Sequence, residues 1–190
     1  MIFAAVVLLN DGDTAGGDPY LPGGQPPGQA VKYKPGKVAN ACDAVDLAAI
    51  VRLGYPSKGK PLHEEVDANG TDGSLECQAE FENANFAGQA DFGWDNDNEL
   101  FNSGKARTIA TPPADSTAQA ISGLGESAYY TLRYVGNAAY TTIEAVVAAK
   151  DGNLFVRTTF KVYGAGIRAD REDVRRLAED QARIMLERLR

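Results

Sequence analysis

The chain has 190 residues, of which 44% are hydrophobic and 24% are charged. This balance is typical of a soluble protein of one domain, and it excludes a disordered chain, a collagen-like repeat and a protein with several membrane spans. Acidic residues outnumber basic ones by 26 to 19, for a net charge of -7, which makes nucleic acid a poor partner. The chain has 2 Cys and 1 His, which are too few side chains for most metal sites and nucleophilic centres. We therefore expect no metal site and no cofactor.

The chain begins with an unbroken apolar run from Met1 to Leu9, and polar residues follow from Asn10. A membrane-spanning helix needs about 20 apolar residues, so this run is about half a span. A secretory signal requires a positively charged stretch before its apolar run, and no such stretch precedes this one. We interpret residues 1–10 as the remnant of a membrane anchor; the alternative is a buried N-terminal strand.

Residues 11–37 have the composition of a linker. They hold seven of the 20 glycines and five of the nine prolines, with few apolar side chains to bury. Such a segment cannot recover the entropy lost on ordering, so we expect it to stay extended and mobile. A folded domain then occupies residues 38–190, and the linker holds it away from the membrane.

Cys42 and Cys77 lie 35 positions apart, and neither belongs to a C-x-x-C pair. The lone His63 cannot complete a four-ligand zinc site with them. For a domain outside a membrane, one structural disulfide is the simplest interpretation. The alternatives are two buried free thiols in a cytosolic protein, or a lipid-modified Cys42.

The folded part begins with a predicted helix over residues 43–53, which Asp43 can cap and Gly54 can end. Two segments with a period of two follow, over residues 74–82 and 89–95, and predict half-buried strands joined by a hairpin at residues 83–85. The predicted inward positions are Leu75, Cys77, Ala79, Phe81, Ala90, Phe92 and Trp94.

The second half repeats this alternation. Residues 128–135 predict a strand, and Asp151-Gly152 predicts a tight hairpin between two more strands, because these residues accept the positive φ angles of the turn. From Asp170 a terminal helix buries one stripe, formed by Val174, Leu177, Ala178, Gln181, Met185 and Leu189. The predicted fold class is α+β, with an antiparallel sheet of about five strands packed by an early helix and a C-terminal helix.

The segment from Pro61 to Gly104 holds 11 acidic residues and no Lys or Arg. A solvated acidic face is the favoured interpretation, and a surface for a cation or a cationic partner is the alternative. Its candidate residues are Asp91, Asp95, Asp97 and Glu99. The run from Asp95 resembles a calcium loop at its start, but Leu100 and Ala106 stand where that loop needs Gly and Glu.

Four tyrosines around one predicted hairpin form a candidate aromatic ligand face: Tyr129, Tyr130, Tyr134 and Tyr140. Strand alternation places Tyr130 and Tyr134 on one side and Tyr129 on the other. Cross-strand packing is the alternative role for these rings.

No catalytic motif stands out, and we predict that the chain is not an enzyme. The segment from Gly125 to Tyr129 lacks the last glycine of a nucleophile elbow, and a predicted strand rather than a helix follows it. A serine triad would have to use His63, which lies in a polar segment. A hydrolase built on His63 is the least supported alternative.

The order of features resembles the actinobacterial secreted and lipoprotein domains of unknown function, a cell-envelope family with sensor-like ectodomains. The likeness rests on Asn40-Ala41-Cys42-Asp43 before a helix that ends at Leu53-Gly54, the second Cys on the first strand, the segment ISGLGESAYY, and the hairpin and helix that close the chain. It covers about Val38 to Arg190.

This resemblance implies a cell-envelope location, a Cys42–Cys77 disulfide and no known enzymatic activity. Two departures stand out. Members often carry a Trp just after the second Cys, where this chain has Gln78 and Ala79. Many members are lipid-anchored, whereas this chain begins with an apolar stub.

Together these features predict a non-enzymatic binding or accessory domain on the extracytoplasmic side of a bacterial cell membrane, tethered through its N-terminal anchor. It would recognise a partner protein or an envelope component through its sheet face or the acidic segment. The alternative is a small-molecule-sensing ectodomain with a pocket between sheet and helix.

Overall fold

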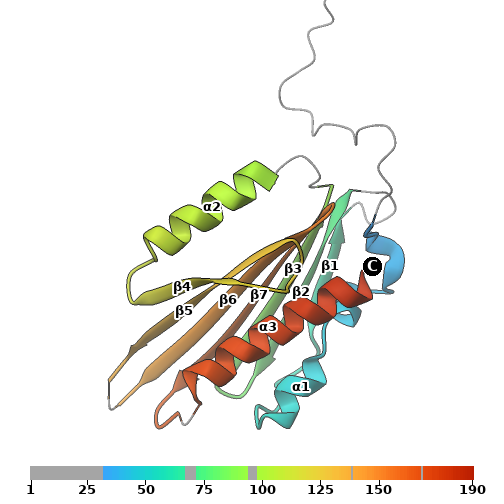
Figure 1. Ribbon diagram of the computed structural model, residues 1–190. Helices are drawn as coiled ribbons and strands as arrows, with labels where there is room; N and C mark the ends of the chain where they lie inside the picture. The colour runs from blue at the N-terminus through green and yellow to red at the C-terminus, as the bar shows by residue number, and fades with distance from the viewer. Residues whose placement is uncertain (1–31, 67–71, 94–97, 138, 168) are drawn as a thin grey trace, which may run out of the picture.

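The computed structural model describes residues 32–66, 72–93, 98–137, 139–167 and 169–190. Within these ranges one antiparallel sheet packs with three α-helices and two short 3-10 helices (Figure 1). The strands are β1 (Leu62–Val66), β2 (Gly73–Phe81), β3 (Ala84–Phe92), β4 (Ser116–Ile121), β5 (Ser127–Gly136), β6 (Thr141–Asp151) and β7 (Leu154–Gly164). The helices are η1 (Pro35–Lys37), η2 (Ala41–Ala44), α1 (Leu47–Arg52), α2 (Asn98–Ala110) and α3 (Arg171–Arg188).

The sheet has the order β1-β2-β3-β7-β6-β5-β4, and every neighbouring pair is antiparallel. The predicted hairpins are confirmed: β2 turns into β3 at Glu82-Asn83, and β6 turns into β7 at Asp151-Gly152. Gly152 has φ 57° there, which is the left-handed conformation that the hairpin turn requires. The long β3–β7 pair joins the two halves of the chain into one sheet.

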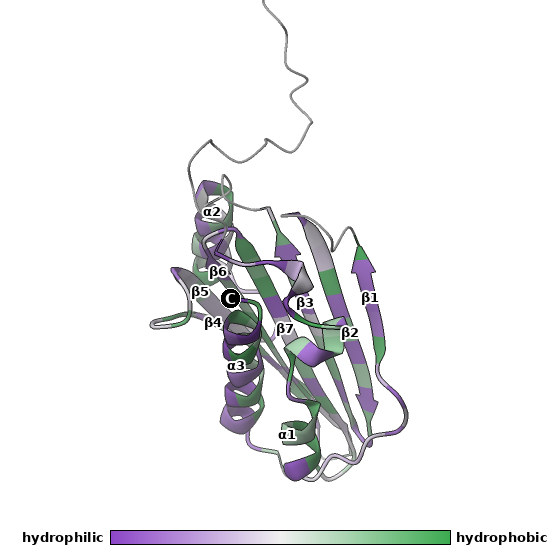
Figure 2. Ribbon diagram, turned by 90° about the vertical axis from the view of Figure 1, so that its right-hand side faces the viewer, coloured by the Kyte–Doolittle hydropathy of each residue, from purple (hydrophilic) through white to green (hydrophobic). Residues whose placement is uncertain are grey.

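The α+β class is confirmed, but the expected count of about five strands is wrong, because the described residues form seven. The two strands that the sequence pattern did not predict, β1 and β4, are the edges of the sheet. All five residues of β1 are exposed, so its sequence lacks the apolar alternation of a half-buried strand. Figure 2 shows β1 largely in the hydrophilic colour, and charged side chains are typical of an edge that must not pair with other chains.

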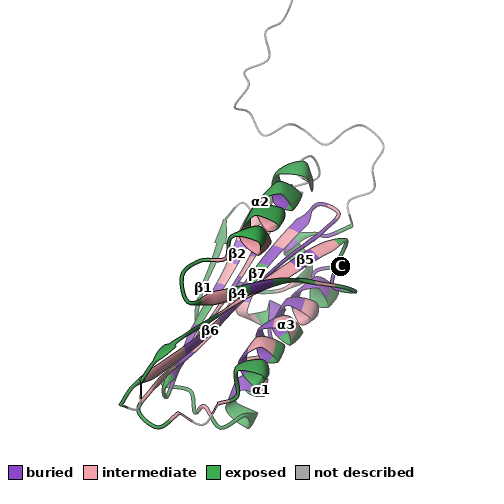
Figure 3. Cartoon of the chain, turned by 60° about the vertical axis from the view of Figure 1, so that its left-hand side comes forward, coloured by how far each residue is buried: buried purple, intermediate pink, exposed green. Residues whose placement is uncertain are grey.

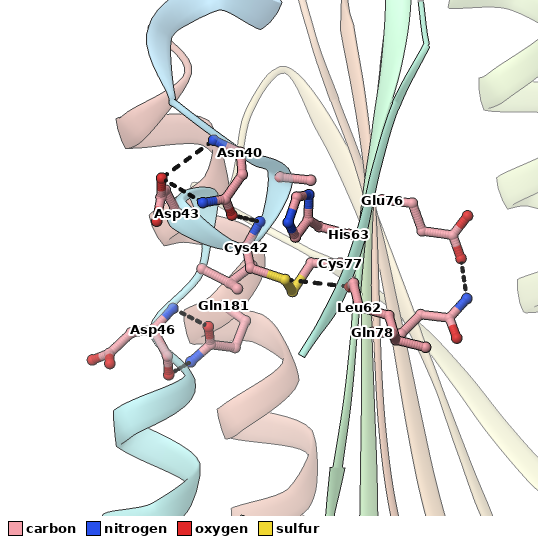
Figure 4. Close-up of a disulfide and its surroundings, with 12 residues drawn as sticks. Asn40, Cys42, Asp43, Asp46, Leu62, His63, Glu76, Cys77, Gln78 and Gln181 are labelled. Carbon is pink, nitrogen blue, oxygen red and sulfur yellow. Dashed lines mark hydrogen bonds between the residues drawn. A yellow bond between two sulfur atoms is a disulfide. The ribbon is translucent and has the colours of Figure 1, made fainter. Parts of the chain in front are cut away.

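The predicted helix over residues 43–53 is two helices, η2 and α1. Asp43 belongs to a capping box with Asn40 around η2, as Figure 4 shows. The cap of α1 is instead Asp46, whose carboxylate accepts a hydrogen bond from the Ala49 amide at 3.2 Å. Two capping residues three positions apart therefore interrupt one apolar pattern.

The core lies between one face of the sheet and the helices η2, α1 and α3. The alternation predicted for the long strands is confirmed, because their inward residues are buried on this face. In β6 and β7 these are Ile143, Ala145, Val147, Ala149, Leu154, Val156, Thr158, Phe160 and Val162. The predicted stripe of the terminal helix is buried against them, and Asp170 caps α3 as expected. Trp94 lies outside the described residues.

Two buried polar side chains in this core are satisfied by hydrogen bonds. The Thr158 hydroxyl donates to the carbonyl of Ala178 in α3 at 2.7 Å. The Gln181 amide pairs with the backbone of Asp46: its Oε1 accepts from the Asp46 amide at 2.8 Å and its Nε2 donates to the Asp46 carbonyl at 3.1 Å (Figure 4). These bonds fix α3 against both β7 and the start of α1.

The second face of the sheet is covered at one place by α2. Phe101 of α2 packs against Tyr129 of β5 and Phe155 of β7, with 5.9 Å between ring centroids in each pair. Both partners point away from the face that α3 covers, and Figure 3 shows α2 and α3 on opposite sides of the sheet. The second face of β1, β2, β3 and β7, named the open face below, carries mainly polar side chains.

Gly88 in β3 allows η2 to approach the sheet. A Cβ atom there would lie 3.3 Å from Val45 and 3.2 Å from the Phe86 ring. We therefore expect Gly88→Val to lower the free energy of unfolding by about 1–3 kcal/mol through overpacking, measured by urea denaturation. Gly59→Val is the matched control, because no atom lies within 4 Å of the corresponding position. Equal stability of the two variants would contradict this close packing.

Candidate functional site

The disulfide between Cys42 and Cys77 holds η2 against β2 (Figure 4). The sulfur atoms lie 2.06 Å apart, which confirms the predicted pairing over the free-thiol alternative. Cys77 is buried on the core face, as the alternation of β2 predicts. The bond therefore ties the N-terminal segment of the domain to the strand next to the edge strand β1.

The chain enters the domain through a set of contacts that we name the clasp: Lys32, Tyr33, Asp151, Asn153 and Arg190. Tyr33 is fully buried, and its hydroxyl donates to the Asp151 carboxylate. The Asn153 side chain accepts from the Tyr33 amide and donates to the Tyr33 carbonyl, both at 3.0 Å. Lys32 and Arg190 contribute ammonium and guanidinium groups at 2.5 and 3.7 Å from the Asp151 carboxylate.

The clasp corrects the predicted boundary between linker and domain. The composition of residues 11–37 suggests a mobile linker up to Lys37, yet Tyr33 and Pro35 are buried. The packed domain therefore includes residues from Lys32 onward. Residues 11–31 of the predicted linker and the predicted anchor remnant at residues 1–10 lie outside the described part of the chain.

The clasp also defines two ends of the sheet. The tail end is the one at the β6–β7 hairpin, where the chain enters, and the free end holds the β2–β3 and β5–β6 turns (Figure 1). Five of the eight large hydrophobic side chains that are exposed in the described residues lie around the free end. These are Val51, Leu53, Tyr134, Val135 and Tyr140, with Leu53 at 56% and Tyr140 at 52% exposure.

The candidate acidic residues do not form a described site. Asp91 in β3 is half-buried, and burial raises the pKa of its carboxyl, with the Glu76 charge acting in the same direction. Its neighbour Gln89 donates to both of its oxygens at 2.9 and 3.2 Å. Glu99 lies exposed in the first turn of α2, where a negative charge suits the helix dipole. Asp95 and Asp97 lie outside the described residues.

The four candidate tyrosines are not brought together on one surface. Tyr130 and Tyr134 lie on the face towards α3, and Tyr129 packs on Phe101 on the other face, so the predicted alternation is confirmed. The Arg171 guanidinium lies 3.6 Å from the centroid of the Tyr134 ring, and that of Arg175 lies 5.1 Å from Tyr130. Tyr140, in the β5–β6 turn, is exposed.

His63 lies on the edge strand β1, opposite Cys77 in the register of the sheet. Its Nδ1 atom is 3.0 Å from the Glu65 carboxylate, and Glu65 also accepts a hydrogen bond from the Ala41 amide at 2.6 Å. Figure 4 shows the imidazole beside the disulfide. In the described residues the hydrogen-bond partner of this ring is thus a carboxylate that also anchors η2.

The first of two hollows near the free end lies between the sheet and the helices α1 and α3. It has a volume of about 390 Å³, with an apolar floor that includes Phe160, Val162 and Val174. Tyr55 lines it and packs edge-to-face on Phe160 at 5.6 Å. Asp173 borders it, and burial, with a smaller contribution from this carboxylate, raises the pKa of Tyr55.

The second hollow lies on the open face towards the free end, with a volume of about 590 Å³. Polar side chains from three strands line it, together with Lys58 and Lys60 of the connection between α1 and β1. Those from the strands are Gln78, Glu80, Asn85, Thr159 and Lys161. No motif in the sequence points to these lysines as a site. The signal for them is the S-K-G-K segment between two prolines, where acidic residues are absent.

Comparison of the sequence with protein-family models and with curated protein sequences gives no match. The resemblance to the actinobacterial envelope domains therefore stays a prediction. Among the described residues, no group of His, Cys, Asp and Glu side chains is arranged to hold a metal ion. No helix in the described ranges is long and apolar enough to cross a membrane.

Loss of the disulfide tests its structural role. Replacing Cys42 and Cys77 by Ala should reduce the free energy of unfolding by about 4 kcal/mol, because the unfolded chain regains the entropy of an open loop. A reductant should lower the melting temperature of the unmodified chain and leave that of the double variant unchanged. A melting temperature that is insensitive to reductant in both proteins would contradict a stabilising bond.

The clasp predicts a loss of stability at alkaline pH. Burial and the bond to Asp151 raise the pKa of Tyr33 above its ordinary value of 10.0, and the same carboxylate raises the pKa of Lys32. Stability from groups with a raised pKa is complete below their ordinary values and is lost as the pH rises through the folded-state values. The free energy of unfolding, measured with urea at several pH values, should therefore fall above about pH 10.

Tyr33→Phe removes the phenol from this equilibrium. It should cost about 1–2 kcal/mol at pH 8 through the lost hydrogen bond, and its stability should fall less steeply above pH 10 than that of the unmodified chain. Tyr140→Phe is the matched control, because Tyr140 is 52% exposed. A pH profile of Tyr33→Phe that parallels the unmodified one would show that the Tyr33 phenol does not contribute.

Proposed function

We propose that this chain is a non-enzymatic extracytoplasmic binding domain, tethered to a bacterial cell membrane through its N-terminal segment, and that it recognises a partner protein or an envelope component. The observation that carries the proposal is the difference between the two ends of the domain. The chain enters at the tail end through a buried clasp, and exposed apolar side chains and both large hollows lie towards the free end.

Two further features support a location outside the cytoplasm. A disulfide between η2 and β2 is typical of proteins that fold in an oxidising compartment. The apolar run at residues 1–9 suits a membrane anchor, and the Gly- and Pro-rich segment after it suits a spacer. With such an anchor, the domain would be attached at its tail end, so the free end would be the end farther from the point of attachment.

The free end has properties of a recognition surface. Single exposed apolar side chains are common on proteins, but here most of the large ones surround one end. Leu53 lies beside the hollow between α1 and α3, whereas Tyr140 lies in the β5–β6 turn. Tyrosine is among the residues that contribute most to binding at protein interfaces.

A small-molecule-sensing ectodomain is the second candidate function. The hollow of about 390 Å³ between the sheet and the helices favours it, because this volume falls in the range of ligand pockets. Its apolar floor and its border of Asn83, Asp170 and Asp173 would take a ligand with an apolar body and a hydrogen-bonding or cationic group.

Site-specific photo-crosslinking in cells that carry the protein tests the proposal. A photoreactive residue at Leu53 or Tyr140 should give a discrete adduct, because both positions are exposed at the free end. The same residue at Leu100, which is 62% exposed in the first turn of α2 at the tail end, is the matched control and should give none. An adduct at Leu100 alone would contradict recognition through the free end.

A further inference from the structure

The hollow on the open face is lined by several cationic side chains. Lys58, Lys60 and Lys161 line it, and none of them forms an ion pair within the described residues. Glu80 is the carboxylate among its lining residues. On a chain with a net charge of -7, three lysines around one hollow form a local region of opposite sign.

Other cations of the domain hold the fold together. Arg175 and Arg183 pair with Glu179 on α3, and Arg188 donates to the carbonyls of Asp43 and Val45. Lys32 is part of the clasp. The lysines of the open-face hollow differ from these groups because they form no ion pair within the described ranges, and Lys58 and Lys60 are exposed.

The backbone that carries two of these lysines is fixed to the sheet. The Lys58 amide donates to the Glu80 carbonyl at 3.0 Å, and the Glu82 amide donates to the Pro56 carbonyl at 2.9 Å. Ser57 forms a bridge with Phe81, and its hydroxyl donates to the Gly59 carbonyl at 2.8 Å. The connection therefore extends the edge of the sheet. The backbone positions from which these lysine side chains reach the hollow are thereby fixed.

Neutral hydrogen-bonding groups complete the lining. Gln78, Asn85 and Thr159 present amide and hydroxyl groups between the lysines. A smaller hollow of about 160 Å³ adjoins this one through Ala87 and Thr159, and Arg157 and Glu76 line it. A ligand longer than one anionic group can thus continue across β3 and β7 towards a fourth cation.

We propose that the open-face hollow binds a phosphate-bearing polymer of the cell envelope, with Lys58, Lys60 and Lys161 contacting its phosphodiester groups. Three separate ammonium groups suit the oxygens of a tetrahedral phosphate, whereas a planar carboxylate is matched best by the fork of an arginine, which this hollow lacks. The choice of a polymer over a lipid headgroup rests on the proposed function, in which the free end faces away from the membrane.

Isothermal titration calorimetry of the full chain with an oligomer of glycerol phosphate tests this inference. The oligomer should bind, and binding should weaken as salt rises, because charged contacts are screened. The triple variant Lys58→Gln, Lys60→Gln, Lys161→Gln should lose affinity about tenfold or more. The double variant Lys34→Gln, Lys37→Gln changes two exposed lysines near the clasp and should bind within about twofold of the unmodified chain.

Two comparison ligands separate the sources of the anion. An oligogalacturonate of equal charge should bind more weakly, and equal affinity for it would overturn the choice of phosphate. Vesicles of phosphatidylglycerol should not compete with the oligomer, and competition that the triple variant abolishes would overturn the polymer in favour of a lipid surface. No binding of the oligomer, or equal loss in both lysine variants with unchanged melting temperatures, would overturn the site itself.

Failure of this inference and failure of the proposed function give different results. If the oligomer does not bind but crosslinks persist at Leu53 or Tyr140, the free end recognises another partner and the phosphate site is rejected. If the oligomer binds through the three lysines but crosslinks form at Leu100 alone, the site stands and the orientation relative to the membrane is rejected.

Discussion

Burial of one face of the sheet under α3 is the constraint on which the remaining features depend. The apolar stripe of α3 covers β6 and β7, and the Thr158 and Gln181 hydrogen bonds fix it to the sheet and to α1. Because helices η2, α1 and α3 all lie on this face, the open face keeps polar and charged side chains. A sheet that is buried on one side and solvated over much of the other places its functional groups on the solvated side.

The two attachments of the N-terminal segment lie at different places along the strands of the sheet. The disulfide ties η2 to the middle of β2, and the clasp ties Tyr33 to the β6–β7 hairpin. Between these two attachments the segment passes from strands of the second half of the chain, β6 and β7, to a strand of the first half, β2. It thereby links the last hairpin to the first strands over the core, in addition to the direct β3–β7 pairing.

Burial decided which parts of this structure could be predicted from the sequence. The strands β2, β3, β6 and β7 and the helix α3 each bury one side, so their periodicity gave correct inward residues. The edge strand β1 and the helix α2 bury little, and Phe101 is the buried hydrophobic of α2. Tyr33 shows the opposite case: its neighbours have the composition of a linker, and its burial depends on Asp151 and Asn153, about 120 positions away. Single-sequence patterns carry no signal for such a contact.

The candidate sites follow the same division. The cysteine pairing could be predicted, because two cysteines allow one bond. The acidic segment stands out by its composition. On the open face, however, its Glu76 and Glu80 lie among cations from elsewhere in the chain, such as Arg157 and Lys161. Local charge along the sequence is therefore a poor guide to the charge of a sheet face, where adjacent strands come from distant segments. The antiparallel order β2-β3-β7 sets Lys161 beside Asn85, and the connection before β1 adds Lys58 and Lys60 from the edge. The cationic hollow thus arises from topology, and an acidic chain gains a place where an anion can approach.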